Sequence, residues 1–192
     1  MNVVDTELPG VLLLEPEVFG DERGFFLEIY NEAALHAAGL EMFGAGGERL
    51  VQINHSRSGR DTVRGLHYQQ PCAQGKLVWV ASGAIFDVAV DVRRGSPTFG
   101  KWTGVELDDQ RHKLIWVPPG FAHGFSVRTE SADVMYACTA YYAPECQHAV
   151  RWDDPDIGID WGVNEPILSP RDAAAPRLCD AAVLADDTGD SA

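Results

Sequence analysis

The sequence has few cysteines, a shortage of basic residues and no long apolar run. Its four cysteines form no Cys-x-x-Cys pair and are irregularly spaced, which argues against a structural zinc site or a thioredoxin-like centre; they are Cys72, Cys138, Cys146 and Cys179. We therefore expect reduced thiols, as in the cytosol. Because no stretch of about 18 apolar residues and no signal-like start is present, we expect a soluble cytoplasmic protein that does not span a membrane.

Acidic residues outnumber basic ones, 29 Asp and Glu against 15 Lys and Arg, and the formal net charge is −14. A chain this acidic disfavours nonspecific nucleic-acid binding, but it is compatible with a local basic pocket for one anionic ligand. Residues 180–192 carry four aspartates and no basic residue, which predicts a disordered tail. We expect residues 1–179 to form a single domain with its own core.

Alternation of apolar and polar residues dominates the sequence and predicts an all-β fold. In residues 84–92 four apolar residues share one face, while Asp87 and Asp91 lie on the other, where they are either solvated or line the inside of a barrel. Residues 76–80 precede this segment across a short connection that we interpret as a hairpin. Further strands are expected at 103–108, 112–120, 124–129 and 133–142. Turn signals separate these segments at intervals of roughly 8–12 residues, the spacing typical of a β-sandwich or barrel.

Two other segments complete the expected architecture. Residues 31–43 predict a helix, capped by Asn31 and ended by Gly39 or Gly44. Residues 151–172 are rich in Pro, Asp and Trp without periodicity, which indicates an ordered loop segment packed on the strands. The fold class is therefore all-β, a jelly roll or a similar closed double sheet.

Polar residues gather at the ends of predicted strands around His67. Arg64 and Lys76 flank it, and His123 follows in "PPGFAHGF", which resembles the second half of a cupin barrel signature. The first half normally supplies a His-x-His pair and a Glu for a metal, but here it reads His67-Tyr68-Gln69 without a following Glu. A metal site needs about three protein ligands. We expect a cupin-type barrel without metal, in which His67 is free to act as a base. The competing interpretation of His67 taken alone is an ordinary surface histidine or a hydrogen-bonded core histidine.

Nine motifs in order extend this resemblance from about residue 5 to residue 175. Together they resemble the dTDP-4-dehydrorhamnose 3,5-epimerase family: "GDERGFFLEIYNE" (20–32), "QINHS" (52–56), "VRGLHYQ" (63–69), "QGKL" (74–77), "GSPTFGKW" (95–102), "PPGFAHGF" (118–125), "YYAPE" (141–145), "RWDDPDIGIDW" (151–161) and "ILSPRD" (167–172). The resemblance implies a cupin-type jelly-roll barrel with short peripheral helices, a homodimer, no metal or other cofactor, and a dTDP-linked 4-keto-6-deoxyhexose as substrate.

The implied reaction is epimerisation at C3 and C5 of dTDP-4-keto-6-deoxy-D-glucose, which gives dTDP-4-keto-L-rhamnose. It needs a base, an enolate stabiliser and an acid on the opposite face of the sugar. The resemblance assigns these roles to His67, Lys76 and Tyr136, with Asp172 holding the base. Without the family, Asp172 would be interpreted as a loop cap, Lys76 as a strand-end lysine and Tyr136 as an ordinary strand aromatic.

The resemblance also implies a set of substrate contacts, with Tyr142 stacked on the thymine ring. These are Arg23, Glu28, Gln52, Asn54, Arg64, His123, Tyr142, Gln147 and Arg171. Glu28, Gln52 and Asn54 lie in segments that either the same chain or the partner subunit of the implied dimer could supply to a site. The family usually reads "YYAPExER", and here Gln147 replaces the second Glu and His148 the Arg. Glutamine keeps hydrogen-bonding capacity but loses the charge, which leaves open which sugar is used and which carbons are inverted.

Three alternatives remain open from the sequence. A relative that inverts only C3 or only C5, as in antibiotic deoxysugar pathways, would use the same His67, Lys76 and Tyr136. A metal-dependent cupin oxygenase is disfavoured by the missing His-x-His pair and Glu. A noncatalytic sugar-nucleotide binder is disfavoured by the complete set of His, Lys, Tyr and Asp.

Overall fold

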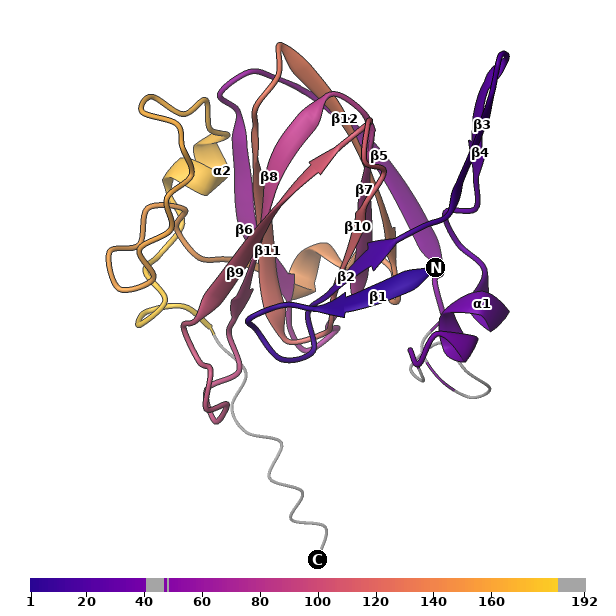
Figure 1. Ribbon diagram of the computed structural model, residues 1–192. Coiled ribbons are helices and arrows are strands. Elements are labelled where there is room, and N and C mark those ends of the chain that lie inside the picture. Colours follow the sequence, from indigo (N-terminus) through magenta and orange to yellow (C-terminus); the bar gives the residue numbers. More distant parts are fainter. Residues whose placement is uncertain (41–46, 48, 183–192) are drawn as a thin grey trace, which may run out of the picture.

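The computed structural model describes residues 1–40, 47 and 49–182, and these form two antiparallel β-sheets packed face to face (Figure 1). The six-stranded sheet has the order β1 (Asn2–Asp5), β2 (Leu12–Glu15), β10 (Leu114–Val117), β7 (Lys76–Ser82), β12 (Ser131–Cys138), β5 (Gln52–Gly59). The five-stranded sheet has the order β13 (Gln147–Ala149), β6 (Val63–Gln69), β11 (Phe121–Val127), β8 (Ala84–Asp91), β9 (Trp102–Asp108). The predicted all-β jelly roll of the cupin type is confirmed.

Smaller elements surround the barrel. A hairpin of β3 (Val18–Asp21) and β4 (Gly24–Leu27) projects from it in Figure 1. Helix α1 spans Glu32–Ala37, and the Asn31 side chain caps it by accepting from the Ala34 amide at 3.1 Å, as predicted. Residues 41–43 of the predicted helix lie outside the described residues. A short 3₁₀ helix covers Pro144–Cys146, and α2 covers Pro170–Ala173.

Strand β8 is covered on both of its faces. Ile85 and Ala89 pack between the two sheets, whereas Val88 and Val90 pack in a second apolar cluster outside the five-stranded sheet. That cluster contains Trp161 from the segment after residue 150, so the prediction of a segment packed on the strands is confirmed. The face with Asp87 and Asp91 points into the barrel and both residues are 0% exposed, so the solvated alternative is wrong.

The connection between β7 and β8 is not a hairpin, contrary to our interpretation. Strand β7 pairs with β10 and β12 in one sheet, whereas β8 pairs with β11 and β9 in the other. Gly83 turns this corner with φ +83°, and a Cβ there would lie 2.3 Å from the Ser131 carbonyl oxygen. A tight corner that only glycine fits therefore carries the chain from sheet to sheet instead of back along its own neighbour.

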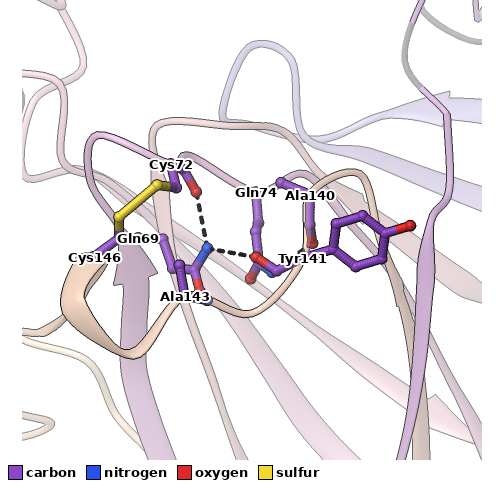
Figure 2. The surroundings of a disulfide bond; sticks show 7 residues. All are labelled: Gln69, Cys72, Gln74, Ala140, Tyr141, Ala143 and Cys146. Atoms are coloured by element: carbon purple, nitrogen blue, oxygen red, sulfur yellow. Dashed lines mark hydrogen bonds between the residues drawn. A yellow bond between two sulfur atoms is a disulfide. The ribbon is translucent and has the colours of Figure 1, made fainter.

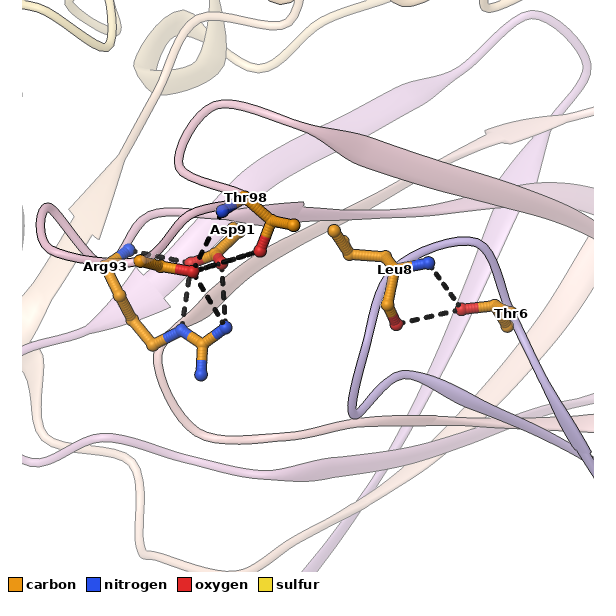
Figure 3. Close-up of polar contacts among 6 residues, drawn as sticks. Thr6, Leu8, Asp91, Arg93 and Thr98 are labelled. Atoms are coloured by element: carbon orange, nitrogen blue, oxygen red, sulfur yellow. Dashed lines mark hydrogen bonds and ion pairs between the residues drawn. The ribbon is translucent and has the colours of Figure 1, made fainter.

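The loop after β8 is held by a buried carboxylate. Asp91 accepts hydrogen bonds from the Arg93 guanidinium at 2.7 and 2.9 Å and from the Thr98 hydroxyl at 2.7 Å, and Figure 3 shows these groups converging on it. The Ser96 hydroxyl donates to it at 2.5 Å. The Arg93 guanidinium also lies 4.4 Å above the ring of Phe121, the first residue of β11. This network fixes the end of β8 to the start of its neighbour.

The first residues of the segment predicted as a tail contact the barrel. Ala181 is buried in the outer apolar cluster, and the Tyr68 hydroxyl donates to the Ala182 carbonyl. Residues 183–192, the rest of that tail, lie outside the described residues. Within the described part of the chain, no helix combines the length and the apolar character needed to cross a membrane.

Candidate active site

A cavity of about 420 Å³ opens between the two sheets. Both strand layers contribute polar side chains to its wall, because β5, β7 and β12 lie on one side and β6 and β11 on the other. Nine of the residues predicted for the site line this cavity: His67, Lys76, Tyr136, Gln52, Asn54, Arg64, His123, Tyr142 and Gln147. The structure thus brings together residues spread over almost a hundred positions of sequence.

His67 on β6 forms a pair with Asp172 on α2. The His67 Nε2 atom lies 2.5 Å from Asp172 Oδ1, although the residues are 105 positions apart. Ser169 caps α2 by accepting from the Asp172 amide at 3.1 Å, which fixes the start of this short helix. Burial raises the pKa of Asp172, but the hydrogen bond and charge of His67 outweigh it, so its pKa lies below the usual 3.8. The carboxylate therefore stays ionised beside the imidazole.

Lys76, the first residue of β7, is a buried cation in the cavity wall. Its Nζ donates to the main-chain carbonyl oxygen of His67 at 3.2 Å, which fixes the Lys76 side chain against strand β6. Burial lowers the pKa of Lys76, and the charges of Cys138 and Asp87 oppose this shift. Because burial removes water from around the amino group, the charge of protonated Lys76 acts on the cavity more strongly than it would in water.

Tyr136 on β12 lines the same cavity as His67, but from the opposite sheet. Burial raises the pKa of the Tyr136 phenol, with a further rise from Cys138 and a partial offset by the positive charge of Arg64. The phenol is thus protonated at neutral pH and available as a hydrogen donor. Arg64 is itself held by its Nε, which donates to the Ser58 hydroxyl at 2.8 Å.

His123 on β11 has a buried partner that the sequence analysis did not name as a site residue. The His123 Nε2 atom lies 2.8 and 3.0 Å from the two carboxylate oxygens of Asp87 on β8. The two strands are adjacent, and His123 also lies opposite His67 across β11 and β6. The signal was present, since Asp87 lies on the face of the 84–92 segment that could line the inside of the barrel.

The amides of β5 form a second polar wall. Gln52 donates from Nε2 to Asn54 Oδ1 at 2.8 Å and accepts from the Tyr142 amide at 2.8 Å. The Asn54 amide lies 3.6 Å from the sulfur of Cys138. These contacts connect the edge strand to the segment that carries Tyr142.

Gln147 joins Tyr142 to α2. Its Oε1 accepts from the Tyr142 hydroxyl at 2.6 Å and from Arg171 Nη1 at 2.5 Å. Arg171 Nη2 also donates to the Gln147 carbonyl at 3.1 Å. Because Arg171 directly precedes Asp172, this one glutamine connects an exposed tyrosine with the helix that holds His67.

Arg23 and Glu28 do not lie in the cavity of their own chain. The Arg23 side chain is 85% exposed on the β3–β4 hairpin and pairs with Asp21. Glu28 follows the hairpin and accepts from the Asn31 side chain at 3.1 Å. Neither residue joins the nine that line the cavity of its own chain, so their contacts to the substrate stay a prediction.

The expectation of four reduced cysteines is also wrong. Cys72 and Cys146 form a disulfide across 74 residues of sequence (Figure 2). Cys138 and Cys179 are free. Cys72 lies on the loop after β6, and Cys146 directly precedes Gln147. Irregular spacing excludes a local motif, but it does not report which cysteines meet in the fold.

No metal-binding group is found among the residues that the structure describes: three or more His, Cys, Asp and Glu side chains nowhere come together as ligands. The two barrel histidines instead each pair with a carboxylate, His67 with Asp172 and His123 with Asp87.

Comparison with known proteins identifies the relatives of this site. The family model for dTDP-4-dehydrorhamnose 3,5-epimerase matches residues 5–180. The chain belongs to this family. The epimerase of that name from Shigella flexneri is 47% identical over 183 residues, which cover 94% of this chain and 98% of the relative.

Solved structures agree with this assignment. The crystal structure of dTDP-6-deoxy-D-glucose-3,5-epimerase from Legionella pneumophila, in complex with dTDP-4-keto-L-rhamnose, is 46% identical, has a TM-score of 0.87 and covers 93% of each chain. A 3'-monoepimerase from Streptomyces bikiniensis, in complex with dTDP-quinovose, is 36% identical with a TM-score of 0.83 and covers 93% of this chain and 88% of its own. The solved structures similar to this chain thus include an enzyme described as a 3'-monoepimerase.

Proposed function

We propose that the protein is a cofactor-independent epimerase that inverts C3 and C5 of dTDP-4-keto-6-deoxy-D-glucose and produces dTDP-4-keto-L-rhamnose. The observation that carries this proposal is the placement of His67 with its Asp172 partner and Tyr136 on opposite sheets of one cavity. Family membership supports the substrate class, because the Legionella relative binds the proposed product.

His67 is the base. The C4 ketone acidifies the hydrogens on C3 and C5, so a neutral imidazole can abstract one of them near neutral pH. When Nε2 donates its hydrogen to the Asp172 carboxylate, Nδ1 is the basic nitrogen, and the carboxylate stabilises the imidazolium that forms. Removal of the proton leaves an enolate with its negative charge on O4.

Lys76 stabilises that enolate. The ammonium is buried and fixed to the His67 carbonyl before substrate arrives, so it needs no reorganisation when the charge develops. Tyr136 then donates its phenolic hydrogen to the carbon from the opposite face, which inverts the centre. The raised pKa of Tyr136 keeps this hydrogen in place until the enolate accepts it.

The nucleotide occupies the outer part of the cavity in this proposal. Tyr142 is half exposed and offers a ring face for thymine, while Gln52 and Asn54 offer amides for the base or its sugar. Arg64 supplies a guanidinium for diphosphate oxygens. Gln147, His123 and Arg171 complete the proposed contacts.

We further propose a homodimer in which the β3–β4 hairpin of one subunit brings Arg23 and Glu28 to the cavity of the other. The hairpin projects from the barrel in Figure 1 and exposes Phe19, Phe25 and Phe26, which is costly in water unless a partner covers them. Two equal hairpins exchanged across a two-fold axis would meet this need. Light scattering after size exclusion checks the mass, and a monomer of 21.0 kDa refutes this arrangement.

Residues 1–179 are proposed to act as one domain. We also propose that the protein acts in the cytoplasm, where free thiols such as those of Cys138 and Cys179 stay reduced. Fractionation of the source cells tests this location.

Hydrogen exchange with buffer tests the reaction. Incubation of dTDP-4-keto-6-deoxy-D-glucose with the enzyme in deuterium oxide is expected to place deuterium at both C3 and C5 of the sugar, read by NMR. Label at one carbon only would replace the proposal with a monoepimerase of the Streptomyces bikiniensis type. No label at either carbon would refute epimerisation of this substrate altogether.

The base is tested by His67→Asn, which is expected to abolish exchange while the fold is retained. The chain offers a matched control in His55→Asn, since His55 also pairs with a carboxylate, Asp133 at 2.8 Å, but lies outside the cavity. The control is expected to keep full activity. Near wild-type turnover by His67→Asn contradicts the assignment of the base.

A further inference from the structure

Two chain crossings close one end of the cavity side by side. Residues 70–75 run from β6 to β7, and residues 139–146 run from β12 towards β13, so both pass from one sheet to the other. Cavity-lining residues lie on both crossings or at their ends, namely Gln69, Gln74, Tyr142 and Gln147. The relative position of the two crossings therefore sets the shape of the cavity where the nucleotide is proposed to bind.

Hydrogen bonds and one covalent bond link the crossings. Figure 2 shows Gln69, whose amide nitrogen donates to the Cys72 carbonyl at 2.9 Å and to the Tyr141 carbonyl at 3.2 Å. Its amide oxygen accepts from the Ala143 amide at 2.9 Å. The disulfide between Cys72 and Cys146 joins the same two segments beside this glutamine.

The disulfide lies one residue from the side chain that organises Tyr142. Cys146 is followed by Gln147, and Gln147 Oε1 accepts from both the Tyr142 hydroxyl and Arg171. Without the covalent link, the 3₁₀ turn that carries Cys146 would be held to the neighbouring crossing by hydrogen bonds such as that from the Gln70 amide to the Cys146 carbonyl at 2.8 Å, which break more readily than a covalent bond. Tyr142 is exposed and has few other side-chain constraints in the described structure, so its ring position depends on this turn.

We infer that Cys72 and Cys146 are positioning residues, whose disulfide holds Gln147 and Tyr142 in the geometry that binds the nucleotide of the substrate. This inference rests on the proposed function, because it assigns the affected step to nucleotide binding. It makes affinity for dTDP dependent on the redox state of the protein. The chemical step at His67 and Tyr136 depends less on this bond, since both side chains lie on strands within the sheets.

Reduction by a dithiol reverses the constraint. A thiolate of the dithiol attacks the sulfur of Cys72, which is exposed, and Cys146, which is buried, leaves as the thiolate. The second dithiol sulfur then displaces Cys72. The S–S bond of the protein is broken, two thiols are formed, and the dithiol is oxidised to its own disulfide.

Mapping of the bond is the first part of the test. Protein purified without reductant, alkylated and digested with trypsin is expected to yield peptide 65–76 linked to peptide 129–151. Fragmentation must place the link at Cys146, because Cys138 lies on the same peptide. Recovery of Cys72 or Cys146 as an alkylated free thiol, or a link through Cys138, overturns the inference.

Binding of dTDP by calorimetry is the second part. Reduction of the wild type is expected to raise the Kd for dTDP by roughly five- to tenfold, because part of one aromatic stacking contact is lost. The variant C72S/C146S is expected to show the same increase without reductant. KM for the sugar nucleotide is expected to rise by the same factor. The value of kcat is expected to change by less than about twofold. Reoxidation is expected to restore the original Kd, which separates this effect from misfolding.

C179S is the matched control, because Cys179 is an exposed free cysteine outside the cavity. It is expected to bind dTDP and respond to reduction as the wild type does. An unchanged Kd after complete reduction overturns the positioning role, even if the melting temperature falls. An oxidised wild type that binds no dTDP refutes both this inference and the proposed function.

Discussion

Replacing Asp91 with asparagine isolates the contribution of one buried carboxylate to stability. Asp91 is 0% exposed and accepts from Arg93, Ser96 and Thr98. Burial by itself raises the pKa of Asp91, but these hydrogen bonds outweigh it and bring the pKa down to about 2 from the usual 3.8. At roughly 1.36 kcal/mol per pH unit, ionised Asp91 contributes about 2 kcal/mol to the free energy of unfolding near neutral pH.

The sign of the pH dependence follows from the lowered pKa. The contribution is fully present above the unfolded value near 3.8 and is lost as the pH falls towards 2, where the folded carboxyl takes up its proton. Asp91→Asn lacks the stabilisation by an ionised carboxylate at every pH, and it turns an amide towards the Arg93 guanidinium. We therefore expect it to be about 2 kcal/mol less stable at pH 7, with the difference narrowing between pH 4 and pH 2.

Urea unfolding at fixed protein concentration measures this difference, and the melting temperature is expected to fall by about 4–8 °C. Asp153→Asn serves as the control, since Asp153 pairs with Arg151 at 2.6 Å on the surface and such pairs contribute little. Catalytic activity at 25 °C is expected to be unchanged in both variants. A stability difference that stays constant from pH 7 to pH 2 would refute the reasoning.

Three further predictions concern the site. Asp172→Asn is expected to lower kcat by roughly 10²- to 10⁴-fold with little change in KM, because the base loses its orienting carboxylate. The control is Asp133→Asn, which removes the carboxylate that pairs with His55 and is expected to leave steady-state kinetics unchanged. Gly65→Ala is expected to abolish folding, seen by circular dichroism, because Gly65 has φ +136° and its Cβ would lie 2.6 Å from the Gly124 Cα; a folded variant contradicts this. Arg23→Ala is expected to raise KM about tenfold if the hairpin serves a partner's cavity; an unchanged KM counts against the exchange.

The strands were predictable because their pattern is local, whereas their partners were not. Alternation in residues 84–92 identified β8 but said nothing about which strand lies beside it, and proximity in sequence suggested β7. The structure pairs β8 with β11 and β9 instead. A corner at Gly83 looks the same in sequence as a hairpin turn, because both need a glycine with positive φ.

Cavity residues were predictable where motifs carried them and not where the third dimension was needed. His67, Lys76 and Tyr136 lie in recognisable motifs, and the structure places all three in one cavity. Cys72 and Cys146 have Cα atoms 5.9 Å apart only because two crossings run side by side. The spacing of cysteines in the sequence cannot predict this pair, since its formation depends on how the two sheets pack together.

Asp87 explains how the barrel tolerates a buried ammonium group at its centre. Burial lowers the pKa of Lys76, which favours release of its proton, and the carboxylate of Asp87 is one of the charges that oppose this. The same carboxylate accepts from His123 on the neighbouring strand. An apolar residue at position 87 would suit the strand better, but it would leave Lys76 with less opposing charge and closer to neutrality. A neutral amine cannot stabilise an enolate by charge, so Asp87 on the barrel-facing side of β8 sustains the electrostatics of the proposed reaction.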